Sequence, residues 1–383
     1  MKPQFVAAVL LAVGCHTIAA APLPAQASPL APSSGLGFIA GAGAGYEVYR
    51  FSEPEAANIE TLSLLTIPLS ARVALPRRTS LLVSGRYARG SLVRADGSEI
   101  TISGPTDTEL QLGIARGQGN LTSSVTAILV LPTGNATHSL AEAEVASVIA
   151  SDLLPVRISH WGSGGGGGLN VGVARVFAGG NAGLSVSYIM AREYEPNDLF
   201  VYRPGNQLQV RGVVDRAVGS AGKATLSLGL EHFSDDALDG TNFFRPGIRY
   251  RAMGSYAFAL RSRSTGVVYL GGVHRAAGDA IVDLFGGFPA QDLLLLGGGM
   301  RLPAGRGVLM PSADVRLFRS DDGLGQGSLL GVGAALEWPA GEVTLVPTLR
   351  ARLGNVVVRT DSESTLTGLD IGLGIRYASP RQR

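Results

Sequence analysis

Residues 366–377 read Leu-Thr-Gly-Leu-Asp-Ile-Gly-Leu-Gly-Ile-Arg-Tyr. From Leu369 to Tyr377 an aliphatic or aromatic side chain stands at every second position, and Gly, Asp or Arg stands between them. A period of two predicts a β-strand whose two faces have different surroundings. One face of this strand is apolar throughout, and the other is small or charged.

The same alternation recurs along the chain for 9–15 residues at a time, for example at 343–353 and 248–260. We expect sixteen strands, and fourteen if the first pair or the weak 265–275 segment is misread. The strands are expected near 36–51, 60–75, 79–94, 107–116, 121–132, 164–178, 182–193, 207–219, 223–234, 246–261, 265–275, 291–302, 307–318, 327–338, 342–354 and 364–377.

The connections between these segments alternate between short and long. Tight turns are expected at 76–78, 117–120, 179–181, 220–222, 262–264, 304–306 and 340–341. Longer polar connections are expected near 52–59, 95–106, 133–163, 194–206, 235–245, 276–290, 319–326 and 355–363. This alternation is typical of outer-membrane barrels, which have short periplasmic turns and longer outer loops. The sequence therefore predicts an all-β fold, an antiparallel up-and-down transmembrane β-barrel with both ends on the periplasmic side.

The composition agrees with a barrel and excludes several other classes. Of the 383 residues 53 are Gly, and 16% are charged, against roughly 25% in soluble domains. Past the first thirty residues there is no apolar run of about 18 residues, which excludes helical spans. The net charge of +2 indicates no nucleic-acid partner, and Cys15 alone forms neither a disulfide nor a thiolate metal cluster. We expect no cofactor and no metal.

The first 27 residues have the pattern of a secretory signal peptide. Lys2 precedes an apolar run at 5–13, and Ala25-Gln26-Ala27 supplies a small-x-small cleavage site. Gly14-Cys15 leaves open a lipoprotein leader instead. We expect a flexible segment at 28–34, the barrel at 35–378 and a short tail at 379–383.

The 133–163 connection is the longest, and it includes a possible helix at 139–154. A loop of this length is usually functional or packed against something. We expect an outer loop that shields the barrel mouth, with an inward-folded constriction or plug as the alternative. The glycine-rich runs at 162–168 and 41–45 lack the context of a phosphate-binding loop, so we interpret them as strand glycines.

The face opposite the aliphatic stripe supplies the candidates for the barrel interior, and Arg outnumbers the acids among them. We expect a solvated or paired charge network; the alternative is a water-filled passage that favours anions. The pore-lining candidates are Arg72, Arg86, Gln111, Arg211, Asp215, Glu231, Arg249, Arg251, Asp314, Arg316, Glu337, Arg350, Arg352, Asp370 and Arg376.

His232 and Ser234 form one enzyme-like pair, on the lipid face at the outer end of a strand. The pair resembles the His-x-Ser of outer-membrane phospholipases and lipid A deacylases, in which His activates Ser. Those enzymes have Asn after the Ser, whereas this chain has Asp235, and no motif surrounds Asp239 or Asn242 as a third residue. We therefore expect no catalysis here and keep a lipid hydrolase as the alternative.

Two short motifs resemble a known family. The segment Gly104-Pro105-Thr106-Asp107-Thr108 opens one strand, and Leu131-Pro132-Thr133-Gly134 ends the next. They are similar to motifs of the outer-membrane barrels associated with the meta-pathway of phenol degradation and, more loosely, of fatty-acid-transporter-type barrels. The likeness covers roughly residues 60–215, including the later strand at 166–173 and the Tyr188 strand. It implies passage of hydrophobic or aromatic small molecules.

The C-terminal strand resembles the assembly signal of outer-membrane barrels, with Tyr377 as the closing aromatic residue. The resemblance implies that the barrel assembly machinery is a partner, together with outer-membrane lipid and lipopolysaccharide. The sequence thus predicts a porin- or transporter-like barrel in a bacterial outer membrane. A lipid hydrolase and a plugged structural barrel are the alternatives.

Overall fold

The computed structural model describes residues 37–156, 158, 160–197, 199–219, 221–260, 263–282, 287–359 and 362–379. The expected leader at 1–27 and the segment at 28–34 lie outside the described residues. The barrel wall runs from Gly37 to Ala378.

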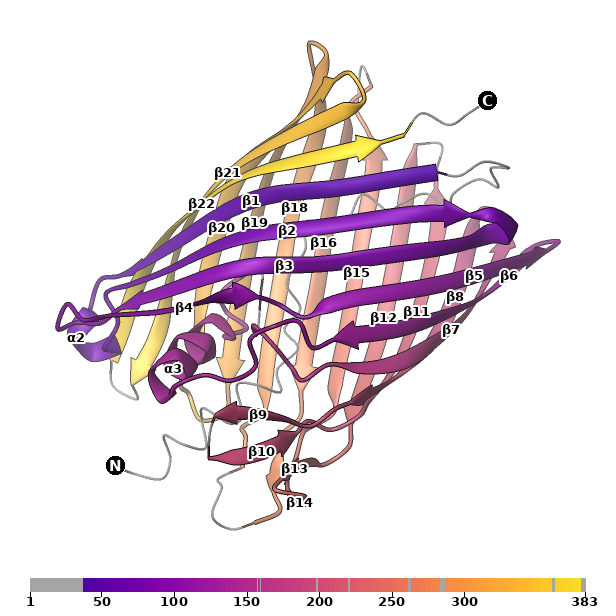
Figure 1. Cartoon of the computed structure of the whole chain (residues 1–383). Helices are drawn as coiled ribbons and strands as arrows, with labels where there is room; N and C mark the ends of the chain where they lie inside the picture. Colours follow the sequence, from indigo (N-terminus) through magenta and orange to yellow (C-terminus); the bar gives the residue numbers. More distant parts are fainter. Residues whose placement is uncertain are drawn as a thin grey trace.

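The strands of the wall form one antiparallel sheet (Figure 1). β1 pairs with both β2 and β22, so the sheet closes on itself. The strands are β1 (Gly37–Phe51), β2 (Thr61–Leu75), β3 (Thr79–Val93), β4 (Glu99–Pro105), β5 (Thr108–Gln118), β6 (Leu121–Leu131), β7 (Gly166–Phe177), β8 (Gly180–Ala191), β11 (Gln207–Val218), β12 (Gly222–Phe233), β15 (Arg249–Ala259), β16 (Thr265–Arg275), β18 (Gln291–Ala304), β19 (Gly307–Ser320), β20 (Gly327–Ala340), β21 (Val343–Arg359) and β22 (Ser362–Ala378).

β4 and β5 are two halves of one wall strand. Both pair with β3, β4 with its outer half and β5 with its first half, and the break between them is at Thr106-Asp107. The described chain therefore forms a closed barrel of sixteen strands, which confirms the expected fold. Because β4 is paired strand, the long connection expected at 95–106 is wrong, and only 94–98 lie between β3 and β4.

The connection expected at 355–363 is also mostly strand. β21 and β22 extend into this segment and pair there as a hairpin, in which Val356 pairs with Ser364 and Val357 with Glu363. β-Branched residues fit an extended, paired backbone, and the polar residues beside them imitate a loop in the sequence. The connections on this side of the barrel are therefore not all long.

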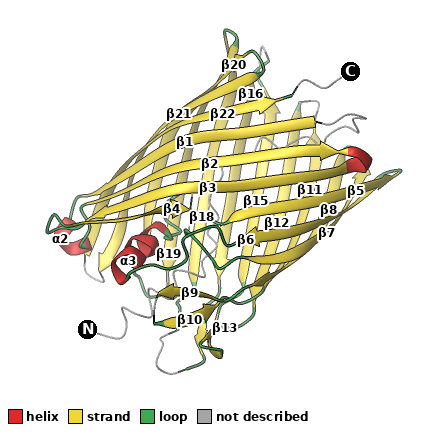
Figure 2. Ribbon diagram, in the orientation of Figure 1, coloured by secondary structure: helices red, strands yellow, loops and turns green. Residues whose placement is uncertain are grey.

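The two ends of the barrel differ. Figure 2 shows the helices α2 (Pro54–Ala57) and α3 (Leu140–Ile149) at the end with long connections, and the single turn η1 (Pro76–Arg78) at the other. β1 begins and β22 ends at the short-turn end. None of the helices in the described residues is long and apolar enough to cross a membrane.

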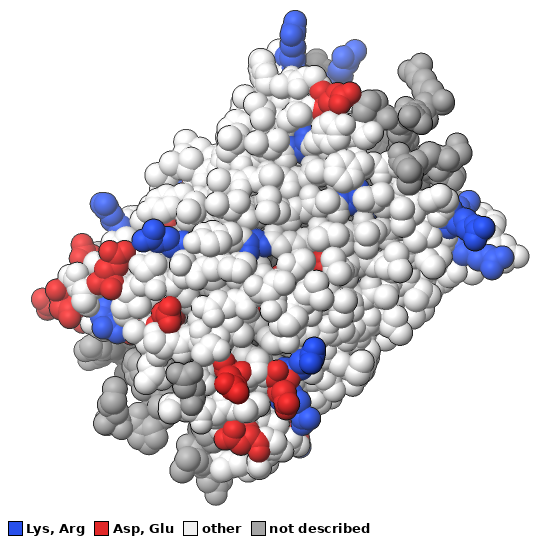
Figure 3. All heavy atoms as spheres, viewed as in Figure 1, with Lys and Arg blue, Asp and Glu red and all other residues white. Residues whose placement is uncertain are grey.

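The outer face of the wall carries an apolar band. Figure 3 shows a broad uncharged zone across the visible face, with charged side chains mostly toward the two ends. Exposed aliphatic side chains of every second strand position form this zone, and aromatic residues lie near its margins, as in membrane barrels. Exposed aromatic residues include Phe38, Phe177, Tyr256 and Trp338 near the short turns, and Tyr46, Tyr188 and Tyr250 toward the other end.

Three of the long connections form a second, five-stranded antiparallel sheet beyond the barrel. Its strands are β9 (Tyr194–Asn197), β10 (Phe200–Arg203), β13 (Asp236–Leu238), β14 (Thr241–Arg245) and β17 (Asp279–Ala280). Tyr194, Tyr202, Phe243 and Phe244 form its apolar core. We call it the loop sheet.

One carboxyl group is buried within the loop sheet. Asp236 accepts hydrogen bonds from the hydroxyl of Tyr202 (2.8 Å) and from the backbone N–H of Gly205 (2.7 Å). Burial raises the pKa of Asp236 to about 6, although these hydrogen bonds and nearby Arg275 act in the opposite direction. The charged form of Asp236 therefore opposes formation of the loop sheet at neutral pH.

We expect the loop sheet to become more stable as the pH falls from 7 to 4. A carboxyl with a pKa of about 6 when folded and 3.8 when exposed contributes stability that is fully present below pH 3.8. This contribution, up to about 3 kcal/mol, is lost as the pH rises through 6. The measurement is hydrogen exchange of β10, β13 and β14, corrected for intrinsic rates.

Asp236→Asn should remove this gain and protect the sheet at pH 7. Asp279→Asn, at an exposed position of the same sheet, is the matched control and should keep it. Burial also lowers the pKa of His138, whose backbone N–H donates a hydrogen bond to the carbonyl of Pro196 in the loop sheet. Protonation of His138 therefore destabilises the sheet as the pH falls, opposite to the effect of Asp236. The Asp236→Asn variant removes the carboxyl contribution and leaves that of His138. Equal protection of the wild-type sheet at pH 7 and pH 5, or a fall toward pH 5, would contradict the prediction.

Candidate functional site in the barrel lumen

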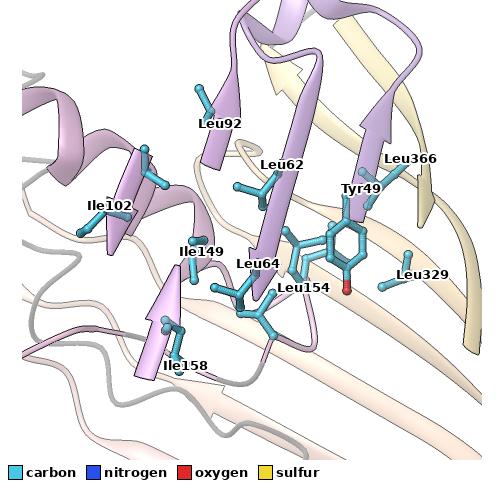
Figure 4. Close-up of a cluster of buried hydrophobic side chains, with 14 of the residues drawn as sticks. Tyr49, Leu62, Leu64, Leu92, Ile102, Ile149, Leu154, Ile158, Leu329 and Leu366 are labelled. Carbon is cyan, nitrogen blue, oxygen red and sulfur yellow. The ribbon is translucent and has the colours of Figure 1, made fainter. Parts of the chain in front are cut away.

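The connection between β6 and β7 folds into the barrel. Val145 and Ile149 of α3 and the residues that follow pack against inward-facing side chains of the wall (Figure 4). The wall contributes Tyr49, Leu62, Leu64, Leu92, Ile102, Phe318, Leu329 and Leu366, each less than a tenth exposed. The expected outer shield is therefore wrong, because this connection, which we call the lumen loop (132–165), occupies the mouth from within.

The lumen loop spans the width of the barrel. α3 lies beside β4, whereas Leu293 of β18 and Phe318 of β19 contact the same apolar cluster. In the pairing order β4 and β18 are on nearly opposite sides of the cylinder. The passage through the barrel is therefore narrowed at this level.

A capping box formed by Ser139 and Glu142 marks the start of α3. The Ser139 side chain accepts a hydrogen bond from the backbone N–H of Glu142, and the Glu142 carboxylate accepts one from the backbone N–H of Ser139. This capping box satisfies backbone donors at the helix start. An ion pair between Glu144 and Arg94 joins α3 to the β3–β4 connection. The helix is shorter than the expected 139–154 because the chain turns into the lumen after Ile149.

Asp107 fastens both ends of the lumen loop to the wall. Its carboxylate accepts hydrogen bonds from the backbone N–H of Gly134 (3.0 Å) and from the N–H (2.8 Å) and hydroxyl (2.7 Å) of Ser163. The hydroxyl groups of Thr108 and Thr133 lie 2.8 Å apart. The two motifs noted in the sequence, at 104–108 and 131–134, thus meet and clamp the loop.

At two positions, only glycine leaves enough space for the lumen loop to pack. A Cβ at Gly134 would lie 2.1 Å from the carbonyl oxygen of Trp161, and one at Gly90 would lie 2.7 Å from Cδ1 of Ile149. Trp161 is fully buried and donates a hydrogen bond from Nε1 to the carbonyl of Ala88 (3.0 Å). Only 166–168 of the 162–168 run belong to a strand, so the strand interpretation of its first part is wrong. Those first glycines belong to the returning loop.

Many of the charged candidates on the inner face form ion pairs. Glu231 pairs with Arg249 (3.4 Å) and Arg251 (2.9 Å) between β12 and β15. The remaining pairs among the candidates and their neighbours are Asp314–Arg350, Asp370–Arg352, Glu337 with Arg301 and Arg376, and Asp215–Lys223. Lys223 and Arg301 were absent from the sequence-based set.

The lumen loop itself meets this charged wall. Arg316 donates a hydrogen bond to the carbonyl oxygen of Asp152 (3.5 Å), and the Asp152 carboxylate interacts electrostatically with both Arg251 and Arg316. Asp152 escaped the sequence analysis because nothing in its neighbourhood marks a turn into the lumen. Its position places an acid of the loop against basic residues of the wall.

Two inward arginines are left without a carboxylate. Arg72 on β2 and Arg211 on β11 have no ion-pair partner among the described residues, and Arg211 is exposed. Arg86 occupies an inward position on β3, and Gln111 donates a hydrogen bond to Glu109 on its own strand. The described inner face therefore keeps positive charge at Arg72 and Arg211 with which no carboxylate pairs, beside one inward acid, Glu109, that likewise has no ion-pair partner among the described residues.

The enzyme-like pair is not assembled. In the described chain no hydrogen bond joins His232 and Ser234; the Ser234 hydroxyl instead accepts one from the backbone N–H of Asn206 (2.8 Å). Arg245 binds Asp235, and the carboxylate of Asp239 accepts the N–H of Val201. A serine nucleophile needs a base oriented by a third group, and these groups bind elsewhere. Nowhere among the described residues do three His, Cys, Asp or Glu side chains gather to hold a metal ion.

No family model matches this sequence, and no curated protein matches it. Three solved structures are similar over most of the chain. OccK11 (OpdR) of Pseudomonas aeruginosa is 10% identical at a TM-score of 0.47, covering 90% of this chain and 96% of that one. A bacterial polysaccharide outer membrane secretin is 10% identical at 0.46, covering 91% and 100%. A triple mutant of Rhodopseudomonas blastica porin is 12% identical at 0.35, covering 89% and 100%. The strand pairing itself establishes the barrel.

We expect Asp107→Ala to release the lumen loop while the barrel stays folded. Each hydrogen bond to a charged group contributes about 1.5–3 kcal/mol, and 1.4 kcal/mol corresponds to roughly tenfold in an opening equilibrium. Limited digestion with subtilisin, read by mass spectrometry, should cleave within 132–165 at least about tenfold faster than in the wild type.

The control is Glu109→Ala, two residues further along the wall, since Glu109 accepts a hydrogen bond only from Gln111 of its own strand among the described residues. Both variants should retain heat-modifiable migration on a gel. A loop equally protected in Asp107→Ala and in the wild type would rule out the clamp.

Proposed function

We propose that this protein is an outer-membrane channel through which small polar solutes, preferentially anions, pass a lumen narrowed by the lumen loop. The observation that carries the proposal is the loop itself, which spans the barrel and meets a charged wall. A sixteen-strand barrel is wide enough for an aqueous passage unless a loop fills it. Here a loop occupies the space beside α3 and meets the wall as far across as Arg316 of β19.

The apolar outer band supports a location in a bacterial outer membrane. Exposed aliphatic residues on most of the wall strands would be costly in water and are favourable in lipid. The expected secretory leader is compatible with this location. Tyr377, outward-facing and near Phe38 (ring centroids 6.1 Å apart), is the proposed assembly signal for the barrel assembly machinery.

Anion preference is favoured by the charges that the wall leaves unpaired. Arg249 and Arg251 share Glu231, so their influence on a passing ion is reduced. Arg72 and Arg211 have no such partner among the described residues, and a fixed positive charge raises the local concentration of anions.

Hydrophobic solutes have less support. The large apolar side chains at the mouth are sealed beneath the lumen loop, each less than a tenth exposed, so they line no open path. The family resemblance implied hydrophobic or aromatic solutes. The accessible inner face is instead rich in Arg, Ser and Gly, which favours polar ones.

The proposal is tested by reversal potentials across a planar bilayer in a tenfold KCl gradient. We expect anion selectivity, which Arg72→Gln and Arg211→Gln together reduce. In water a unit charge about 8 Å away acts on an ion with about 0.5 kcal/mol, roughly a twofold change in local concentration per arginine. Because the same charge lowers the local cation concentration by the same factor, the anion-to-cation permeability ratio should fall about fourfold per arginine at low salt.

Arg89→Gln is the control, because Arg89 is exposed on the outward-facing side of β3. It should leave selectivity unchanged. Cation selectivity of the wild-type channel, or a folded barrel that passes no current, would contradict the proposed function.

A further inference from the structure

Five arginines form a continuous arc at the short-turn end of the barrel. Arg77 and Arg78 lie in η1, and Arg116, Arg175 and Arg216 lie near the turn ends of β5, β7 and β11. The wall sector from β2 to β11 holds all five, and all are exposed. None of them has an ion-pair partner among the described residues. We call them the turn-end arc.

The strand arginines of the arc lie on the outward face. Arg116 alternates with Leu112 and Ile114, which are exposed aliphatic residues of the same strand. Arg175 follows Val171 and Val173 in the same way on β7. Arg116 and Arg175 lie where the apolar band ends. At such a position the methylene groups of an arginine side chain lie along apolar surface, and its guanidinium group reaches the polar boundary of the membrane.

The η1 arginines extend the arc along the wall. A Cβ at Gly117, on the inward side of β5, would lie 2.8 Å from a guanidinium nitrogen of Arg78. Arg78 therefore approaches β5 from the lumen side, and the outward face of the arc on the strands is formed by Arg116, Arg175 and Arg216. The connections 76–78, 117–120 and 178–179 of this sector contain no acidic residue. The arc therefore presents positive charge that forms no ion pair among the described residues.

The backbone of η1 adds a second observation. Arg77 has φ of 60° and Arg78 of 59°, in the left-handed region that favours glycine. Other short turns of the same sector place glycine there, at Gly119, Gly179 and Gly219. Arg77 and Arg78 adopt this conformation despite its cost to a residue with a side chain, as does Arg263 in the short turn between β15 and β16.

The opposite end of the barrel differs in sign. Figure 3 shows acidic side chains gathered mostly at the end with long connections, with basic side chains among them, whereas the right-hand, short-turn end carries basic side chains. Acidic residues of the long connections include Glu53, Glu55, Glu60, Asp96, Asp235 and Asp239. An anionic partner is therefore favoured at one end only.

We propose that the turn-end arc binds the headgroups of anionic phospholipids, of the phosphatidylglycerol class, in the leaflet next to the short turns. A guanidinium group forms paired, charge-assisted hydrogen bonds with phosphate oxygens. The arc lies at the margin of the lipid-facing band, which places its charges at headgroup depth. This inference rests on the membrane location given above and is independent of conduction.

The test is native mass spectrometry of the refolded full chain in neutral detergent with equal amounts of phosphatidylglycerol and phosphatidylcholine. We expect phosphatidylglycerol to be retained preferentially. Arg77, Arg116 and Arg175 changed together to Gln should reduce this preference by about fivefold per arginine. The preference of the wild type should also disappear between 50 mM and 500 mM salt, a measurement that needs no variant.

The matched control changes Arg50, Arg89 and Arg203, exposed near the other end, to Gln and should keep the preference. No preference in the wild type, an equal loss in the control, or displacement of phosphatidylglycerol by lipopolysaccharide from the same arginines would overturn the inference. Conductance is measured on the same preparations. A barrel that conducts without lipid preference refutes only the arc, and one that binds lipid without conducting refutes only the channel.

Discussion

Every backbone N–H and C=O group of a chain in lipid must find its partner within the protein, since hydrocarbon offers none. The pairing of β1 with β22 meets this requirement, because it removes the two edges that an open sheet of this size would expose. The rest of the structure follows from closure. Once the wall is a cylinder, each strand has one face toward lipid and one toward the lumen, and the two-residue period of the sequence is the consequence.

Closure of sixteen strands also creates a space that wall side chains do not fill. The lumen loop occupies the outer part of this space, and the wall is adapted to it at one point. At Thr106-Asp107 the wall strand breaks into β4 and β5, and β6 ends opposite this break, so that the chain leaves the wall where Asp107 can hold it. The lumen loop is attached at this break. The two motifs are separated in the sequence by the β5–β6 hairpin, in which Thr108 pairs with Leu131 and so brings them together.

The sequence was sufficient for the number and order of the wall strands, because each strand repeats one physical rule. It missed β4 and the outer ends of β21 and β22, where polar residues imitate a loop. It was insufficient for the loop, because α3 shows only that Val145 and Ile149 need an apolar partner and not where that partner is. A signal did exist at Leu62, Leu64 and Leu65, where both faces of β2 are apolar, which a water-filled interior would not favour. The loop sheet was missed because strands as short as β10 and β13 hold too few residues to show a period.

Arginine has two different roles in this molecule, and the presence of a carboxylate separates them. Beside Glu231, Asp314 or Asp370, arginine forms an ion pair that joins strands of the inner wall. Removing the acid would leave the arginine charge without its partner. At Arg72 and Arg211 inside, and along the turn-end arc, no ion pair forms among the described residues, and the charge is available to something that is not protein. The chain as a whole is almost neutral, with 32 basic and 30 acidic residues. Its electrostatic character therefore arises from where arginine lacks a partner rather than from how much arginine it contains.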